Sequence, residues 1–503
     1  MSKSKLQDLI STSRRRDSTA KHNTLDSSTH SDRARVIYSA SFRRLQQKAQ
    51  VFSLESNAAV RSRLTHSIEV SHIGRYIVSK ITEKLKEKQE TCGDIKFWID
   101  YSSAISNIVE TACLIHDIGN PPFGHFGEAA IVDWAHSDEA KGTVKKALGA
   151  GHEKLLYEFK CFDGNPQGFR LVTRIQGDDG FYGLNLTNTQ LASFLKYSFC
   201  YEDDYKGKPF SKKMGYFSTE KDIVQKIWSS LDMSPNKRHP LSFLMEAADD
   251  ISYCISDIED GIEKGVCSFY DFKSFIEENL AQDSSSNNFI DTLINKLSKD
   301  SGAAVSPFVD FKTCLQNHLV EHVAESFTQN FVDYINSDID KQIISDDTLE
   351  YKVLKCMKEF SRDKLFCSTE AESIEISGYA VISGILHSFQ SILELKKSKF
   401  LYLIAKDQKE IKNHNLHFES RLFNRLPSKH LNAYKAAILN KKNLTFNPSE
   451  NVSNKEFTES MNEFDDNKEW VLRAHLIIDF ISGMTDQFSL DFFQVLKGIR
   501  IAK

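Results

Sequence analysis

The sequence predicts an all-α protein with little β structure, and three observations support this. The 503 residues include only nine Pro and 22 Gly, fewer than a turn-rich β-sandwich or a linker-rich chain uses. Apolar residues recur at helical spacing in several long segments. The 35 Phe residues supply large side chains that pack between helices. A chain of this length buries a large core, so it needs neither disulfides nor a metal in order to fold.

The composition excludes several classes of protein. Charged residues make up 26% and the net charge is −5, which excludes a basic protein that coats nucleic acid but leaves a local basic patch open. The nine cysteines are scattered and form no C-x-x-C pair, so we expect free thiols in a reducing compartment. The first residues lack the apolar segment of a secretory signal, and no run of about 18 apolar residues predicts a membrane span. We therefore expect a cytoplasmic protein that does not enter a membrane.

The chain is expected to have three parts. Residues 1–32 are rich in Ser, Thr, Arg and Lys and predict an extended basic arm, which carries the cluster Arg14–Arg16. Residues 33–280 form the expected catalytic core, and residues 281–503 the expected helical C-terminal region. The polar tract 282–288 marks the boundary between these two parts as a surface loop.

Three helices are predicted from apolar spacing. The first passes through Ile68, Ile73, Ile77, Ile81 and Leu85. The second passes through Ile105, Ile108, Ala112 and Ile115. The third passes through Leu241, Leu244, Ala248, Ile251, Ile255, Ile258 and Ile262. The adjacent Pro121 and Pro122 must end the second helix, because proline lacks the amide hydrogen that a helix interior needs. Residues 447–468 are polar and predict a further surface loop.

The second predicted helix ends in His116 and Asp117, after an apolar run. A buried, unpaired aspartate is costly, so this pair demands a partner. Partners are available on the other two helices, where His66 and Asp249 stand among apolar or small residues. Two histidines with two aspartates suit Mn²⁺, Fe²⁺ or Mg²⁺ better than a structural Zn²⁺. From spacing alone, ordinary surface or core residues are the alternative, and Asp250 is as good a ligand as Asp249.

The chain resembles the HD phosphohydrolase superfamily and, more narrowly, the bacterial deoxyguanosine triphosphate triphosphohydrolases (dGTPases). The resemblance extends from about residue 33 to residue 486 in family order. It is carried by the segments RRLQQKAQVF (43–52), RSRLTHS (61–67), HDIGNPPFGHFGE (116–128), FDGNPQG (162–168), EAADDISY (246–253) and SGMTD (482–486). The segments 136–160 and 280–350 match poorly, and 447–468 resembles an insertion.

The resemblance implies an HD-domain helical core over 33–280 and a C-terminal helical region that completes the substrate site and the oligomer contacts. It implies that Mg²⁺ or Mn²⁺ is bound by four ligands, with the first aspartate of the Asp249–Asp250 pair among them. These implied ligands are His66, His116, Asp117 and Asp249. The implied reaction is attack of water on the α-phosphorus of dGTP, which gives deoxyguanosine and triphosphate.

His125 and Glu128 follow the double proline with i,i+3 spacing, so they meet if the segment is helical. A surface ion pair is the alternative. In the reading that the resemblance implies, His125 reaches the α-phosphate as the catalytic residue, and Glu128 fixes its tautomer and keeps it protonated.

The resemblance also implies contacts to substrate. Cations should surround the triphosphate, a carboxylate suits the N–H groups of guanine, and an aromatic ring under C2′ excludes ribonucleotides. The residues expected in these roles are Gln50, Arg63, Asn165, Lys196, Tyr197, Lys213, Tyr253, Glu375 and Arg421. Among them, Arg421 belongs to a segment that approaches a neighbouring subunit's site in the family.

The expected partners are dGTP, other copies of this chain in a homo-oligomer, by resemblance a hexamer, and single-stranded DNA as an effector. Two other functions stay open at this point. One is a hydrolase of broader deoxynucleotide specificity or another HD phosphatase. The other is an inactive regulator that binds nucleotides or single-stranded DNA.

Overall fold

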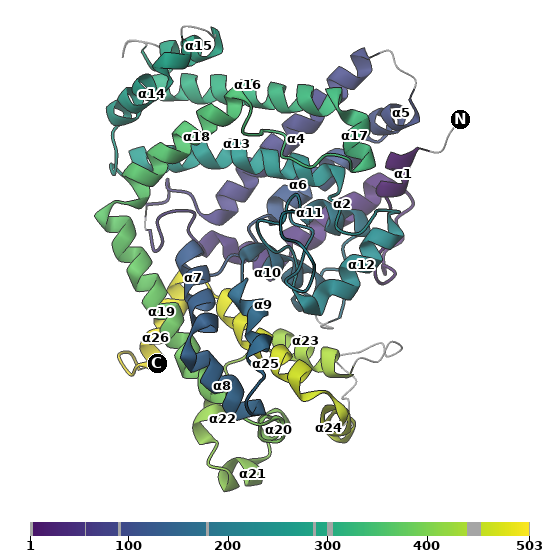
Figure 1. Cartoon of the computed structure of the whole chain (residues 1–503), viewed down its shortest axis with the longest axis vertical. Helices are drawn as coiled ribbons and strands as arrows, with labels where there is room; N and C mark the ends of the chain where they lie inside the picture. The colour runs from purple at the N-terminus through teal and green to yellow at the C-terminus, as the bar shows by residue number, and fades with distance from the viewer. Residues whose placement is uncertain are drawn as a thin grey trace.

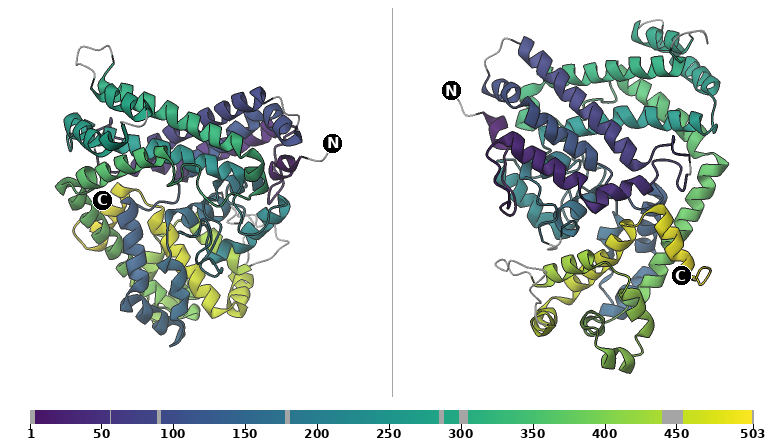
Figure 2. Two further views of the ribbon diagram at one scale, coloured as in Figure 1. Left: turned by 45° about the horizontal axis from the view of Figure 1, so that its top comes forward. Right: turned by 180° about the vertical axis from the view of Figure 1, so that it is seen from behind.

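The structure, a computed structural model, describes residues 4–55, 57–88, 92–177, 181–284, 288–298, 305–439 and 454–501. Helices make up all the regular elements in these ranges, and two isolated β-bridges are the only strand-like pairings that they contain. The all-α prediction is therefore confirmed. Figures 1 and 2 show helices stacked in two groups, one above the other in the view of Figure 1.

The first group of helices shares one large buried apolar cluster, which we call the first core. Its central helices are α4, α6 and α13, and the long α16 covers α4. The group comprises α1 (Lys5–Leu9), α2 (Leu25–Ile37), α3 (Ala40–Arg44), α4 (Arg63–Glu87), α5 (Gly93–Asp100), α6 (Ser102–Ile115), α10 (Gly164–Arg170), α11 (Asn188–Phe194), α12 (Lys221–Ser230), α13 (Pro240–Glu263), α14 (Phe269–Ser284), α15 (Asn288–Leu297), α16 (Pro307–Gln329), α17 (Phe331–Asn336) and α18 (Leu349–Phe360).

The second group shares a separate buried cluster, the second core. It comprises α7 (Gly124–His136), α8 (Asp138–Leu148), α9 (Tyr157–Lys160), α19 (Thr369–Leu393), α20 (Lys397–Ala405), α21 (Gln408–Asn413), α22 (His417–Phe423), α23 (Ser428–Leu439), α24 (Asn454–Glu463), α25 (Asp466–Ser482) and α26 (Asp486–Leu496).

The two cores do not divide at residue 280. Helices α7 to α9 belong by sequence to the expected catalytic core, yet they pack with the C-terminal helices, and α19 lies along α7 (Figure 1). The reason is the apolar face of α7, where Ala130, Ile131 and Trp134 are buried in the second core. The packing thus corrects the boundary: residues 123–162 join the C-terminal region. The turn that precedes α7 lies where the two cores meet.

The sequence explains where the central helices begin and end. Ser62 and Thr65 form a capping box at the start of α4. Pro240 occupies the first turn of α13, where its missing amide hydrogen is harmless. One inward residue was predicted wrongly, since Ile68 is 51% exposed while Ile73 and Ile77 are buried. Five residues turn a helix by about 140° beyond a full turn, so Ile68 and Ile73 cannot share one face.

The N-terminal segment is not a free extended arm. Helix α2 crosses the predicted boundary at residue 32. Arg14 forms an ion pair with the buried carboxylate of Asp32, and Arg15 donates to the carbonyl oxygens of Thr173 and Phe181. The guanidinium of Arg16 lies 5.2 Å from the centre of the Tyr182 ring. The arginines are therefore tied into the fold, because buried Asp32 and free carbonyl groups need donors.

Both predicted polar loops are partly helical. Helix α14 continues to Ser284 and α15 begins at Asn288, while 285–287 lie outside the described residues. Helix α24 occupies 454–463 of the second tract, and 447–453 also lie outside. Phe457 and Met461, four residues apart, give α24 a buried face, which the polarity of the tract concealed.

Helix α19 is long and apolar enough, by length and composition alone, to span a membrane. Its buried side chains, among them Ile382, Ile385 and Phe389, pack into the second core against α7 and α26. Three glutamates stand in its first two turns. This packing accounts for its composition as that of a helix in a protein core.

Candidate active site

A cavity of about 650 Å³ opens where the first core meets the second. The first core contributes residues of α4, α6 and α13, and the second contributes residues of α7 and α19. Thirteen of the fifteen predicted site residues line this cavity: Gln50, Arg63, His116, Asp117, His125, Glu128, Asn165, Lys196, Tyr197, Lys213, Asp249, Tyr253 and Glu375.

The two remaining residues lie elsewhere. His66 is fully buried directly beside the cavity. Arg421 is exposed on α22 and does not line the cavity of its own chain.

At the floor of the cavity, His66, His116 and Asp249 converge. One nitrogen of each histidine and a carboxylate oxygen of Asp249 all lie within 4.8 Å of one another. His66 Nε2 is 3.5 Å and His116 Nε2 is 3.4 Å from the same oxygen, Oδ1 of Asp249. These three side chains come from α4, the end of α6 and the middle of α13, as the sequence predicted.

Asp117 stands at the edge of this cluster, with its Oδ2 3.6 Å from His116 Nε2. Arg63 donates to the same oxygen at 2.5 Å, and Asn120 donates to Oδ1 at 2.8 Å. Burial favours the neutral acid, but His116 and Arg63 outweigh it and lower the pKa of Asp117 to about 2. Asp117 is thus an anion held in place on both of its oxygens.

The residues present fit a divalent metal. Both ring nitrogens of buried His66 and Nε2 of His116 have no hydrogen-bond partner in the described part of the chain. His116 Nδ1 lies 2.7 Å from the carbonyl oxygen of Cys113, which fixes the ring with Nε2 toward Asp249. Unpartnered buried nitrogens are costly, and a metal ion would satisfy one nitrogen of each histidine. The six carboxylates that line the cavity also outnumber its four Lys and Arg side chains.

The structure distinguishes the two aspartates that the sequence left open. Asp249 faces the histidines, whereas Oδ1 of Asp250 accepts from Lys358 Nζ at 3.0 Å. Neighbouring residues on a helix point about 100° apart, so only one of them faces the histidines. That residue is the first of the pair, as the resemblance implies.

His125 lies across the cavity on α7, and its side chain is 82% exposed. Its Nδ1 is 2.9 Å from Glu128 Oε2. The other oxygen of Glu128 accepts from the main-chain N–H of Gly164 at 2.8 Å. The hydrogen bond to Glu128 raises the pKa of His125, which favours the imidazolium. His125 Nε2 is the ring nitrogen left to act on a bound molecule.

Four cations line the cavity at different sites. Arg63 faces Asp117, and Lys196 lies 3.7 Å from both Glu246 and Asp249. Lys213 pairs with Asp163 at 2.5 Å, and Lys358 pairs with Asp250. Burial disfavours charge on Lys196, but Glu246 and Asp249 outweigh it and raise its pKa, so it is charged. An anion that enters the cavity meets positive charge from α4, α18 and two loops.

Several lining residues were missed by the sequence analysis. Lys358 lies near the end of α18, and Phe366 ends the π-helical segment Ser361–Phe366 that follows it, more than 100 residues beyond Asp249. Neither belongs to a motif, and only the fold brings them to the site. Phe194 and Asp163 lie close in sequence to the predicted residues Lys196 and Asn165. This proximity was the only indication in the sequence that they line the site, and it is a weak one.

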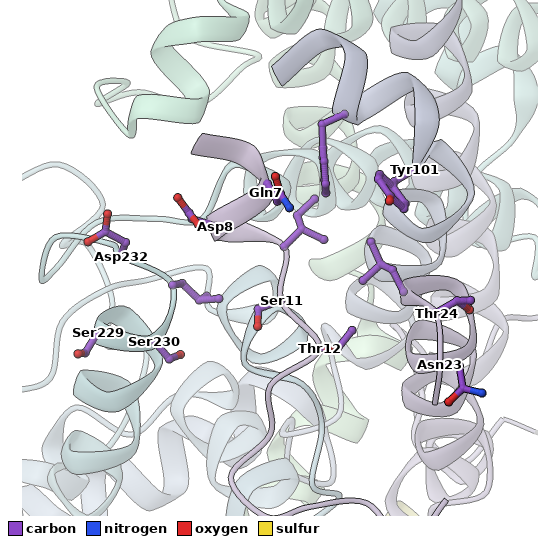
Figure 3. A pocket seen from close by; sticks show the side chains of 14 residues that line it. Gln7, Asp8, Ser11, Thr12, Asn23, Thr24, Tyr101, Ser229, Ser230 and Asp232 are labelled. Carbon is purple, nitrogen blue, oxygen red and sulfur yellow. The ribbon is translucent and has the colours of Figure 1, made fainter. Parts of the chain in front are cut away.

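A second cavity, of about 710 Å³, lies on the first core among α1, α2, α5 and α12 (Figure 3). Hydroxyl and amide groups line it, together with the carboxylates of Asp8 and Asp232. None of the described residues that line it is Lys or Arg, so it does not suit a triphosphate.

The comparisons agree with this geometry. An HD domain family model matches residues 63–160. The chain is 33% identical over 499 residues to the probable deoxyguanosinetriphosphate triphosphohydrolase of Pseudomonas aeruginosa, an alignment that covers 93% of this chain and 92% of that relative. It is 34% identical over 503 residues to the deoxyguanosinetriphosphate triphosphohydrolase of Yersinia pestis, and 33% over 501 residues to that of Klebsiella pneumoniae, with 93% of each chain covered in both cases.

A helical core that gathers His66, His116 and Asp249 beside the His116–Asp117 turn defines a hydrolase of the HD-domain class. More narrowly, the chain belongs to the family of bacterial deoxyguanosinetriphosphate triphosphohydrolases. It is accordingly an enzyme.

Proposed function

We propose that this enzyme hydrolyses dGTP to deoxyguanosine and inorganic triphosphate. One observation carries the proposal: two groups of side chains meet at the same cavity. They are the cluster of His66, His116 and Asp249 and the pair of His125 and Glu128. The names of the relatives agree with dGTP as the substrate.

The proposed metal ligands are His66, His116, Asp117 and Asp249, with Mg²⁺ or Mn²⁺ as the ion. When bound, a divalent ion supplies positive charge to the phosphoryl oxygens and makes water a better nucleophile. Its charge also offsets the excess of carboxylates in the cavity, which would otherwise repel a nucleotide with about four negative charges.

The remaining groups bind and orient the triphosphate. Arg63 is placed beside Asp117 and grips the α-phosphate in this proposal. Lys196, Tyr197 and Lys213 receive the β- and γ-phosphates. Lys213 exchanges its contact with Asp163 for phosphate, which its half-exposed side chain permits.

In the proposed reaction, the oxygen of water forms a bond to the α-phosphorus and the bond from that phosphorus to O5′ breaks. The leaving 5′-oxygen takes a proton from His125, because an alkoxide is a poor leaving group. Glu128 accepts from Nδ1–H of His125 and so keeps the ring protonated until Nε2 gives up its proton, and the hydrogen bond from Gly164 holds Glu128. The proton lost by the attacking water passes to solvent, from which His125 is protonated again.

The nucleoside is recognised by the rest of the cavity. Glu375 accepts from the N1–H and the 2-amino group of guanine. Tyr253, Gln50 and Asn165 line the proposed sugar pocket, where an unpaired 2′-hydroxyl would cost on the order of 2 kcal/mol.

Assembly and location belong to the proposal as well. We propose a homo-oligomer, hexameric by resemblance, in which Arg421 serves a neighbouring chain's site, and a cytoplasmic enzyme. Activation by single-stranded DNA remains a prediction of the resemblance, and it no longer has support from a free basic arm, because Arg14 and Arg15 are bonded within the fold.

The test is to incubate the protein with each deoxynucleoside triphosphate and with GTP, in the presence of Mg²⁺ or Mn²⁺, in water enriched in ¹⁸O. We expect deoxyguanosine and triphosphate from dGTP, with the label in triphosphate. Asp249→Asn, prepared identically, controls for contaminating phosphatases. Formation of dGMP and pyrophosphate, or label in the 5′-hydroxyl, would contradict the proposed reaction. Equal turnover of all four deoxynucleotides would replace it with the broader specificity.

A further inference from the structure

Lys48 is a buried lysine that lies outside the cavity but next to its wall. Its side chain is almost inaccessible, and the residue is 4% exposed. Its Nζ donates to the main-chain oxygen of Asn120 at 2.5 Å and to that of Ser482 at 2.7 Å. It thereby connects the turn after Asp117 to the end of α25, more than 350 residues further along the chain.

Asp486, at the start of α26, makes the complementary contacts. It is 3% exposed. Its Oδ1 accepts from the main-chain N–H of Phe123, and its Oδ2 accepts from that of Ala49, both at 3.1 Å. Lys48 and Asp486 together join the segments 48–49, 120–123 and 482–486. Buried polar groups are costly unless they are hydrogen-bonded, so these four contacts hold the three segments together.

The turn held in this way carries catalytic groups at both of its ends. On one side, the side chain of Asn120 donates to Asp117. On the other side, Phe123 precedes Gly124 and His125. Phe123 has a φ of 59°, a left-handed conformation that a bulky side chain rarely adopts. Such a conformation persists only where surrounding contacts impose it, and the bond from Phe123 N–H to Asp486 is one of these contacts.

We propose that Lys48 and Asp486 are positioning residues, which set the distance between the metal ligand Asp117 and the proton donor His125. They touch neither the metal cluster nor the cavity, and they act through the turn at 120–123. This inference rests on the proposed function, because it assigns a purpose to the placement of those two groups.

The inference requires a particular kinetic signature. A displacement of catalytic groups by about 1 Å costs on the order of 10²-fold in rate while substrate binding survives. Lys48→Met removes both donors at nearly constant volume, and Asp486→Asn removes the charge and one acceptor. We expect each variant to lower kcat for dGTP at least 10-fold and to change KM less than threefold. The double variant should lose little more than the worse single variant, because both residues act on one turn.

The matched control is Lys397→Met. Lys397 also donates to two main-chain oxygens, those of Asn462 and Phe464, at the far end of the second core, and it pairs in addition with Asp466. The Lys397→Met variant should lower the melting temperature as Lys48→Met does, but its kcat should stay within twofold of that of the protein without substitutions.

The outcomes separate the two proposals. An unchanged protein that does not hydrolyse dGTP overturns the proposed function itself. The positioning role is wrong in a different case. There the protein without substitutions hydrolyses dGTP, and Lys48→Met and Asp486→Asn both fold but have the same kcat as Lys397→Met. Failure of both variants to fold would also overturn it, since the contacts would then serve stability alone.

Discussion

Glu128 holds His125 and the start of α10 at the same time, with one carboxylate oxygen for each. The oxygen nearer to His125 lies 2.9 Å from Nδ1 and raises the pKa of the imidazole. The other oxygen accepts from Gly164. One side chain therefore favours the protonated form of His125 and also helps to hold the start of α10.

Glu128→Gln should shift the pH profile of kcat. In the proposed reaction His125 acts in its protonated form, so activity should be present below its pKa and be lost as the pH rises through it. Glu128 raises that pKa, and its loss should move the alkaline limb to lower pH. Glutamine can still accept from Gly164, so the position of α10 is preserved. The position of the alkaline limb is measured from the pH dependence of steady-state kcat. A limb that does not move in Glu128→Gln would contradict the role of Glu128.

His125→Ala should slow the chemical step by about 10²- to 10⁴-fold, the scale of a positioned acid. The metal cluster lies on other helices, so metal content and dGTP affinity should persist. Single-turnover rates and equilibrium binding measure the two separately. A single-turnover rate equal to that of the unchanged protein would refute the role of His125.

Removal of the metal with a chelator should abolish turnover, and Mn²⁺ or Mg²⁺ should restore it. Asp117→Ala should lose both metal and activity, because it removes a proposed ligand and leaves Arg63 without its partner. Metal content is measured by elemental analysis of the purified protein. Full activity of the metal-free variant would eliminate the proposed site.

Arg421→Ala should weaken dGTP binding or turnover without loss of metal, although Arg421 does not line its own chain's cavity. Oligomers that mix Arg421→Ala chains with Asp117→Ala chains should regain part of the activity. In some sites of such an oligomer, an Arg421→Ala chain would supply the intact proposed metal ligands and a neighbouring Asp117→Ala chain would supply the intact Arg421. Absence of recovery after verified subunit exchange, or a fully active monomer, would show that Arg421 does not act in a neighbour's site.

Arg14→Met should lower the free energy of unfolding by about 3–5 kcal/mol, because it leaves the buried carboxylate of Asp32 without its counter-ion. Addition of Asp32→Asn should recover part of that loss. Arg362→Met, which removes an exposed pair with Asp363, is the control and should leave the free energy of unfolding almost unchanged. Equal effects of Arg14→Met and Arg362→Met in urea unfolding would mean that the N-terminal segment is not part of the cooperative fold.

The convergence of His66, His116 and Asp249 was predictable because its signals are local. His66 and Asp249 are polar residues within apolar helical patterns, and His116–Asp117 stands before a double proline. The helices themselves followed from the same patterns, apart from the orientation of Ile68.

Other features depend on contacts between distant segments and leave no local signal. Lys358 reaches the cavity only because α18 packs on α13. The packing of α7 against the C-terminal helices depends on which helices cover its apolar face. The apolar pattern of one helix shows which face is buried, but it does not show which helix packs there. The N-terminal segment looked like an arm because its composition is polar, yet the buried Asp32 that secures Arg14 lies on a helix whose partners the sequence does not reveal.

The cavity lies between two separately buried cores, with His66, His116 and Asp249 on helices of the first and His125 on a helix of the second. Loosening of the second core would carry His125 away while His66, His116 and Asp249 stay together. Such a protein would still take up metal and yet be inert, so metal retention is a poor measure of whether a stored or heated sample is intact.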